Sequence, residues 1–151
     1  MRLNNAILVV FMLALSTFSF AQNTQNEERK MLLEIHELIN VKRSIYLQAP
    51  LKLNDSLNAI ARRHSEAMAS HKIPFGHQGA DARDSLIRVY FPNAQGTGEN
   101  VTIAETAEDA VESWWISEGH KANMLGDYTD TGIGVVKRDE WWFCTQIFLQ
   151  R

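Results

Sequence analysis

Three side chains of this sequence have types that could do chemistry together: the imidazoles of His77 and His120 and the carboxylate of Glu99. Two imidazoles and one carboxylate can bind a divalent ion such as zinc and leave one coordination position open to water. The same groups can act without a metal, as an acid–base pair or as a hydrogen-bonding cluster. His77, Glu99 and His120 are therefore candidate catalytic residues, and the two histidines are candidate metal ligands.

The spacing of these residues along the chain does not choose between the alternatives. The sequence contains no His-Glu-x-x-His motif, no cysteine pair and no Gly-x-Ser-x-Gly motif. A structural role is equally open: Glu99 could accept backbone N–H bonds and hold the loop after Gly98. The amide of Asn100 is expected to bridge backbone groups, and Asn123 is expected to bind the backbone of its own turn.

Two helices are predicted in the N-terminal half. Apolar residues recur at helical spacing from Glu27 to about Ser44. Pro50 then breaks the pattern, because the residue before a proline resists helical geometry. Asn54 is a good N-cap for a second helix that runs to about Ser70. His64 lies on the apolar side of this helix, where a hydrogen-bonded core histidine is expected.

The middle of the chain is predicted to carry two further helices and an extended segment. A short helix is expected over 81–89 and a strand or extended segment over 99–104. Thr106 has the position of an N-cap for the next helix, which is expected to end at Gly119 and to present His120 just past that turn. Trp114 and Trp115 cannot both be fully buried on one helix, so one should pack in the core. The other, taken as Trp115, should line a cleft or a contact surface.

The C-terminal part is predicted to form an antiparallel hairpin. One strand lies within Thr131–Val136, and its glycines suggest that another element packs closely against it. The second strand covers Trp141–Leu149. The predicted helices come mostly before these two strands, so the expected fold class is α+β.

Composition limits the partners and the means of stabilisation. The formal net charge of the 151 residues is −3 and basic clusters are lacking, which argues against nucleic acid as a partner. Cys144 is the only cysteine, so no disulfide can form within the chain. We expect Cys144 to be a small buried hydrophobe rather than a nucleophile.

The N-terminus has the features of a secretory signal peptide. Arg2 precedes an apolar run over 6–20, and Ser19-Phe20-Ala21 offers a small-x-small cleavage site. The run is shorter than the roughly 20 residues of a membrane span. The prediction is a signal peptide over 1–21, a polar lead-in over 22–30 and one domain over 31–151. No integral membrane segment would remain after cleavage, and the protein would be periplasmic, envelope-associated or extracellular. An N-terminal anchor that is never cleaved is the alternative.

An ordered set of motifs in this domain resembles the CAP superfamily, also called the SCP domain. This family includes cysteine-rich secretory proteins, antigen five and plant pathogenesis-related proteins, and it has many short bacterial members. The resemblance covers about Leu32 to Phe148. Its motifs are the helix with Leu57, Ala61, Ser65 and Met68, then Phe75-Gly76-His77, Gly98-Glu99-Asn100, the run Trp114 to Met124, and Gly132-Ile133-Gly134-Val135.

The resemblance implies a three-layer α–β–α sandwich with a mainly antiparallel central sheet. It also implies a cleft lined by two histidines and acidic residues. By motif position, His77 and His120 match the family's two cleft histidines, and Glu99 matches its Gly-Glu-Asn glutamate. Animal and plant members have a second glutamate before the last histidine, for which Glu118 is the nearest candidate here. Glu118 could equally be a solvent-facing residue.

For function, the resemblance favours a secreted protein that binds a lipid- or sterol-like ligand, or a protein partner, without catalysis. The fold does not decide this, since family members are similar in fold and diverse in role. One alternative is a metal-assisted, protease-like hydrolase in which His77, His120 and Glu99 activate water with zinc or another divalent cation. A second alternative is that the cluster only holds loops together.

Overall fold

The computed structural model describes the backbone of residues 3–151 and the side chains of residues 22–151. It divides into two compact units, Met1–Lys30 and Met31–Arg151. The predicted signal peptide, residues 1–21, lies outside the part of the chain whose side chains are described. Within the described residues, no helix combines the length and the apolar character that crossing a membrane requires.

The polar lead-in, residues 22–30, is helical and belongs to α1 (Leu3–Ile45), although the helix was predicted to begin only at Glu27. This segment is rich in Gln, Glu, Arg and Lys, which lose little side-chain freedom in a helix. Its residues also pair along the helix, since Asn23 Nδ2 donates to Glu27 Oε1 over 3.2 Å. Most of these residue types and this side-chain pair therefore favour the helix.

Four strands form one mixed sheet in the order β1-β3-β4-β2. The strands are β1 (Lys52–Leu53), β2 (Gly96–Ala104), β3 (Asp130–Arg138) and β4 (Trp141–Gln150). β4 pairs antiparallel with both β3 and β2, whereas the short β1 pairs parallel with β3. The predicted β3–β4 hairpin and the mainly antiparallel sheet are confirmed.

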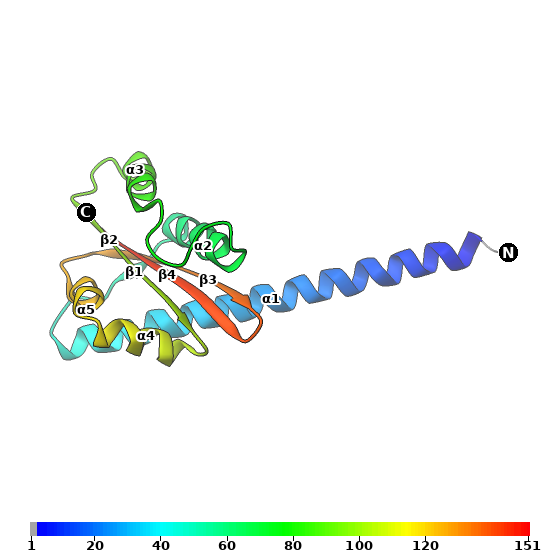
Figure 1. The fold of residues 1–151 in the computed structure, drawn as a ribbon, viewed down its shortest axis with the longest axis horizontal. Coiled ribbons are helices and arrows are strands. Elements are labelled where there is room, and N and C mark those ends of the chain that lie inside the picture. Colours follow the sequence, from blue (N-terminus) through cyan, green and yellow to red (C-terminus); the bar gives the residue numbers. More distant parts are fainter. Residues whose placement is uncertain (1–2) are drawn as a thin grey trace. The chain divides into compact units, whose positions relative to one another are not determined.

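Helices cover both faces of this sheet, so the expected three-layer α+β architecture is confirmed. Figure 1 shows α2 (Asp55–Ala69) and α3 (Ala80–Tyr90) on one face. The part of α1 from Met31 onward, α4 (Ala107–Ile116) and α5 (Glu118–Leu125) lie on the other. Successive side chains of β4 point to opposite faces of the sheet and so contribute to the core on both sides. Cys144 and Phe148 pack toward α1 and α4, while Ile147 and Leu149 pack toward α2 and α3.

The predicted N-caps are confirmed by their hydrogen bonds. Asn54 Oδ1 accepts from the backbone N–H groups of Ser56 and Leu57 at the start of α2. Thr106 Oγ1 accepts from the N–H of Asp109 at the start of α4. Each side chain satisfies helix N–H groups that have no partner within the helix, which fixes where the helix begins.

The two glycines of β3 allow α2 to lie directly on the sheet, as the sequence suggested. A Cβ added to Gly134 would lie 2.0 Å from the backbone nitrogen of Arg62, and one added to Gly132 would lie 2.2 Å from the carbonyl carbon of Leu57. Neither neighbour can move, because both atoms belong to the backbone of α2. Glycine is therefore required at both positions by the close approach.

The prediction for the end of α4 is wrong. α4 ends at Ile116, Ser117 is extended with φ −87° and ψ 120°, and a separate helix, α5, begins at Glu118. Gly119 therefore lies inside α5 and does not form a turn. Ser117 makes the break, because its carbonyl accepts from Lys121 N–H and so starts a new helix in another direction.

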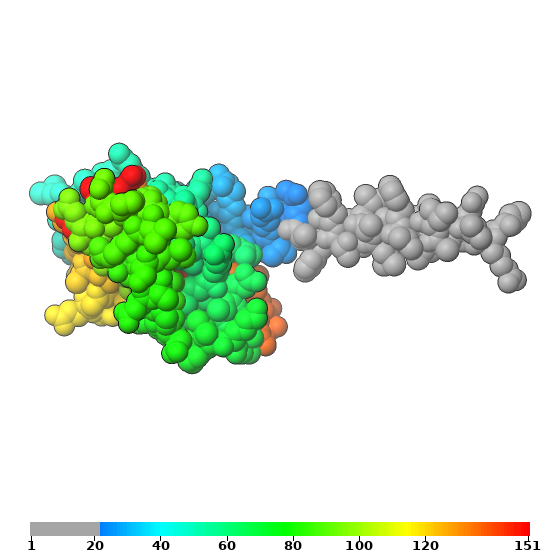
Figure 2. Space-filling view, turned by 90° about the horizontal axis from the view of Figure 1, so that it is seen from above, coloured from blue at the N-terminus to red at the C-terminus, as the bar shows by residue number. Residues whose placement is uncertain are grey.

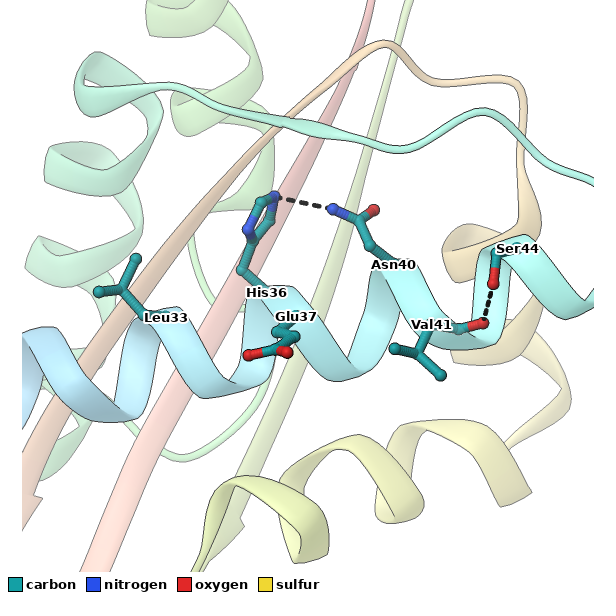
Figure 3. Close-up of a pocket in the computed structure, with 6 residues that line it drawn as sticks. All are labelled: Leu33, His36, Glu37, Asn40, Val41 and Ser44. Atoms are coloured by element: carbon teal, nitrogen blue, oxygen red, sulfur yellow. Dashed lines mark hydrogen bonds between the residues drawn. The ribbon is translucent and has the colours of Figure 1, made fainter.

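The C-terminal part of α1 is fixed by buried polar contacts. Arg43 is 1% exposed, and its guanidinium donates to the carbonyls of Ala49, Met124 and Gly126. One turn earlier, the Asn40 amide bonds both the N–H and the carbonyl of Leu51. Asn40 also borders a shallow hollow of about 480 Å³ along α1. Figure 3 shows the lining residues of this hollow: Leu33, His36, Glu37, Asn40, Val41 and Ser44.

The opposite face is formed by α2 and α3, which appear in green in Figure 2. The C-terminal residues, in red, emerge beside the segment that follows α3. There the guanidinium of Arg151 lies 5.7 Å from the centroid of the Phe91 ring and pairs with the carboxylate of Asp130. The C-terminus is thus tied to both β3 and the α3 layer.

Candidate functional site: the His77–Glu99–His120 cluster

The three candidate residues come from three separate elements. His77 lies in the connection between α2 and α3, where Gly76 has a φ of 132° that side chains other than hydrogen rarely allow. Glu99 lies in β2, in register with Ile147 of β4. His120 lies in the first turn of α5 rather than after a turn. The structure brings all three together.

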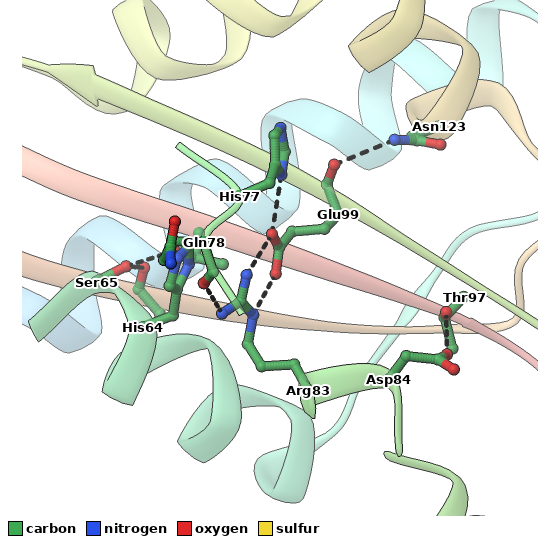
Figure 4. A network of polar contacts seen from close by, with 11 residues as sticks. His64, Ser65, His77, Gln78, Arg83, Asp84, Thr97, Glu99 and Asn123 are labelled. Carbon is green, nitrogen blue, oxygen red and sulfur yellow. Dashed lines mark hydrogen bonds and ion pairs between the residues drawn. The ribbon is translucent and has the colours of Figure 1, made fainter. Parts of the chain in front are cut away.

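The geometry of this cluster is close enough for shared chemistry. The ring centroids of His77 and His120 are 6.1 Å apart with an interplanar angle of 47°. His77 Nδ1 lies 2.9 Å from Glu99 Oε1, and Figure 4 shows this contact at the centre of a polar network. The His77 side chain is half exposed at 49%, whereas that of Glu99 is 13% exposed.

Arg83 is a partner of Glu99 that the sequence did not reveal. Its Nε donates to Glu99 Oε2 over 2.6 Å and its Nη2 donates to Oε1 over 2.7 Å, which makes a bidentate ion pair. Its Nη1 donates to the carbonyl of Gln78 over 2.8 Å. Arg83 comes from α3, where it is one of several charged residues on a short helix. Only the packing of α3 against β2 distinguishes it from the others.

These contacts set the charge states of the cluster. Burial raises the pKa of Glu99, but hydrogen bonds from Arg83 and His77 outweigh burial and leave the pKa below its ordinary value. Glu99 is therefore ionised near neutral pH and can only accept hydrogen bonds. His77 must then carry its proton on Nδ1 when it donates to Glu99. Burial, with a smaller effect of the charge on His77, lowers the pKa of His120.

Two amides hold α5 against β2 beside the cluster. Asn100 is fully buried, and its Nδ2 donates to the carbonyl of His120 over 3.1 Å. Asn123 Nδ2 donates to Asn100 Oδ1 over 2.9 Å and to the carbonyl of Glu99 over 3.3 Å. The Asn100 amide was expected to bridge backbone groups; it bonds one backbone carbonyl, that of His120, and the side chain of Asn123. The local role expected for Asn123 is wrong, because its amide links two distant elements.

Two other candidate residues lie away from these contacts. Glu118 is exposed at the first position of α5. The ring of Trp115 is half-buried, with Tyr46 at a centroid distance of 5.4 Å and the amines of Lys42 and Lys121 each 4.4 Å from its centroid. Trp114 is the core tryptophan of the pair, as expected, with no exposed surface. The contacts of Trp115 therefore join α1, α4 and α5.

A second buried polar network lies under the cluster, between α2 and β4. His64 Nδ1 is 3.1 Å from Thr145 Oγ1, and the Ser65 hydroxyl is within hydrogen-bonding distance of Thr145 Oγ1 and of the Gly134 carbonyl. His64 is 3% exposed, as the sequence predicted. Burial, together with the nearby charge of Arg83, lowers the pKa of His64 to about 4. His64 is thus a neutral core histidine.

The donor set of the cluster fits a zinc ion only in part. His77 and His120 supply two imidazoles, but the carboxylate of Glu99 is already neutralised by Arg83, whose positive charge would oppose a cation. Within the part of the chain that the structure describes, no group of three His, Cys, Asp or Glu side chains has the arrangement of a metal site. A three-ligand site at Glu99 would require Arg83 to move away.

Comparison with known proteins identifies the family. Residues 36–148 match the family model of the cysteine-rich secretory protein family, CAP. The chain belongs to the CAP family. Although the family is described as cysteine-rich, this chain has one cysteine, Cys144, which is buried and unpaired.

Several bacterial proteins are similar to this CAP domain. "Uncharacterized protein YkwD" of Bacillus subtilis (strain 168) is 29% identical over 138 residues, which cover 89% of this chain and 51% of that protein. The crystal structure of an extracellular protein containing a SCP domain from Bacillus anthracis superposes with a TM-score of 0.74 at 27% identity, over 86% of this chain and 43% of that one. An outer surface protein of Borrelia burgdorferi shares the fold at 20% identity, with a TM-score of 0.65 over 77% of this chain and 89% of that one. The chain spans about half, or less, of the curated relatives it matches.

Proposed function

We propose that this chain is an exported CAP domain that binds a lipid- or sterol-like ligand, or a protein partner, at the His77–Glu99–His120 cluster. Binding takes place at the cell envelope or outside the cell, and no reaction is catalysed on the ligand. Support for export comes from the sequence of residues 1–21 and from the similarity to an extracellular SCP-domain protein. Support for binding without catalysis comes from the geometry of the cluster.

The observation that carries the proposal is the ion pair between Arg83 and Glu99. A glutamate that activates water must have a free oxygen and a basicity matched to neutral pH. Both oxygens of Glu99 accept from Arg83, and one of them also accepts from His77. The lowered pKa makes Glu99 a weak base. Glu99 is therefore suited to holding His77 in one orientation.

The two imidazoles remain as the groups that contact a ligand. In the tautomer that donates from Nδ1 to Glu99, Nε2 of His77 keeps a lone pair that can accept a hydrogen bond from a hydroxyl or amide. The lowered pKa of His120 favours its neutral form. Two imidazoles on a partly exposed surface can hydrogen-bond the polar head of such a ligand.

The metal-assisted hydrolase is the second candidate, and the 6.1 Å between the two imidazole rings favours it. Two histidines at this separation could share one divalent ion after small rotations of their side chains. The ion pair of Glu99 opposes it, since the expected third group is occupied by Arg83. The purely structural role is supported by the same ion pair, which joins β2 to α3 and to the loop that carries His77.

Calorimetric titration separates these three functions. Zinc chloride, cholesterol and palmitate are titrated into the protein that begins at Gln22 and into its His77→Ala, His120→Ala double variant. The binding proposal expects a sterol or fatty-acid signal that the double variant loses, with no cleavage of peptide or ester substrates. Zinc binding together with hydrolysis, both lost in the double variant, would favour the hydrolase.

A matched control keeps the titration specific. Tyr90→Ala removes an exposed ring on α3 that lies outside the cluster and should bind the probes as the parent protein does. If the double variant loses stability in urea while no probe binds the parent protein, the cluster is structural and the proposal fails.

A further inference from the structure

A second hollow lies at the far end of the hairpin, on the sheet face that α2 covers. α2 ends at Ala69, but the hairpin continues beyond it, so the last residues of this face have no helix above them. Trp141 pairs with Arg138 across the hairpin, and Phe143 pairs with Ile103 on the other side of β4. We call this hollow of about 490 Å³ the hairpin-end pocket; it is lined by His71, Ile103, Arg138, Asp139, Trp141 and Phe143.

The floor and wall of the hairpin-end pocket are apolar. Side chains on facing positions of neighbouring strands point to the same side of a sheet, so Ile103, Phe143 and Trp141 share one surface. Trp141 is 47% exposed, a large aromatic surface left in contact with water. Phe143 packs against the small core under the end of α2, which keeps this wall rigid.

The rim carries polar groups of both signs. The guanidinium of Arg138 donates to the carbonyl of Ala69, which orients it over the end of α2. Asp139 lies in the turn of the hairpin, and His71 lies just past the end of α2. Among the hydrogen bonds and ion pairs of the described residues, none involves the side chain of His71 or Asp139. These two side chains therefore keep their hydrogen-bonding capacity for another molecule.

The backbone at His71 and Asp139 places both side chains at the rim of this pocket. His71 has a φ of 56°, and the N–H groups of His71 and Lys72 bond the carbonyls of Met68 and Ala67 to close α2. Helices that end this way usually have glycine at that position, because a Cβ is disfavoured there. Asp139, on the other side of the pocket, has a φ of 54°. Both side chains therefore line the same pocket, one after the end of α2 and one in the hairpin turn.

We infer that the hairpin-end pocket binds a neutral saccharide. Arg138 and Asp139 offer a donor and an acceptor of opposite charge, so an anion or a cation would meet repulsion from one of them. A sugar hydroxyl both donates and accepts, and the face of a pyranose ring with equatorial substituents is apolar enough to lie on Trp141. The volume is within the range of small-molecule sites and admits one or two sugar rings. This site shares no residue with the His77–Glu99–His120 cluster, so it goes beyond the proposed function.

The test is a titration followed by NMR on the indole N–H signals of the four tryptophans. Cellobiose and N,N′-diacetylchitobiose are added to the protein that begins at Gln22. A saturable shift of the Trp141 signal is expected, with a Kd on the order of 1 mM, while Trp114 in the core stays unchanged. Trp141→Ala lacks this signal, so the backbone amide signals of Phe143 and Ile103 report binding in it; they should shift in the parent and not in the variant, which should stay folded because the Trp141 side chain is half exposed. Tyr90→Ala removes an aromatic of 58% exposure on α3 and should bind as the parent does.

His71→Gly distinguishes a binding role from a structural one. Glycine suits the backbone at this position, so the melting temperature should stay the same or rise by up to about 3 °C. Binding should weaken by about 3-fold to 10-fold, because a rim group that bonds the sugar is lost. The inference is overturned if neither sugar shifts the Trp141 signal up to roughly 20-fold above the expected Kd. Unchanged binding in Trp141→Ala or in His71→Gly would overturn it as well.

Discussion

Replacing Arg83 by methionine tests the claim that Glu99 is held as a buried, ionised acceptor. The variant leaves a carboxylate that is 13% exposed and loses both bonds of its bidentate partner, while His77 still donates to it. Breaking a buried ion pair by removing one partner costs about 3–5 kcal/mol. Because some exposure and the His77 bond remain, we expect a loss of about 2–4 kcal/mol in the free energy of unfolding.

The loss of stability in Arg83→Met should depend on pH. In the parent protein the pKa of Glu99 is below its ordinary value, so its contribution to stability is present above that value and is lost as pH falls through the lowered pKa. In Arg83→Met, burial dominates and raises the pKa of Glu99. The folded variant then takes up a proton more readily than the unfolded chain as pH falls. The difference in stability between parent and variant should therefore be smaller at pH 4 than at pH 7.

Urea unfolding at both pH values measures this difference, and two further variants control it. Arg88→Met breaks an exposed ion pair with Asp84 on the same helix and should cost less than about 1 kcal/mol. Arg83→Met combined with Glu99→Gln should be more stable at pH 7 than Arg83→Met alone, because no unpaired charge stays buried. A loss below about 1 kcal/mol, or one that is equal at pH 7 and pH 4, would refute the account of Glu99.

Three further predictions follow from buried groups. Because the pKa of His64 is lowered to about 4, the unfolded chain takes up a proton on this histidine at higher pH than the folded protein, and the free energy of unfolding should decline as pH falls from about 6.5 to 4. His64→Gln should make this decline shallower in urea unfolding at stepped pH, and an unchanged decline would count against the role of His64. Gly134→Ala should lower the free energy of unfolding by about 3 kcal/mol or more, because the added Cβ meets the backbone of α2. Gly119→Ala, which has open space around it in α5, should raise the free energy of unfolding by up to about 1 kcal/mol, and equal melting temperatures of the two variants would contradict this. Burial raises the pKa of the Cys144 thiol, so a thiol reagent such as DTNB should label it only after unfolding, and rapid labelling of the native protein would show that it is accessible.

Local signals along the chain predicted most of the elements correctly. The caps at Asn54 and Thr106, the spacing of apolar residues and the hairpin turn act between residues close in sequence, so their effects can be read without the fold. The glycines of β3 were informative for the same reason, since a missing side chain in a strand signals close packing. The failure at Gly119 has a local cause too: glycine often ends helices, but Ser117 ended this one first.

The candidate cluster was harder to predict because its geometry depends on contacts between distant segments. The residues His77, Glu99 and His120 were found by motif, and the structure places them together. Arg83 was missed because no residue type or spacing marks one arginine on a charged helix as the partner of a buried carboxylate. Asn123 was assigned to its own turn, although its amide reaches β2.

The sequence by itself determined where α2 and α4 begin, which faces of most elements are apolar, and to which family the motifs belong. The helix starts and the apolar faces depend on caps and on periodicity, which act over a few residues. Only the tertiary structure decided the charge state of Glu99, the orientation of His77 and the opening of the hairpin-end pocket. The charge state and the orientation depend on which groups from distant segments lie within hydrogen-bonding distance. The pocket depends on where α2 ends over the β3–β4 hairpin. Such distances follow from packing of the whole domain.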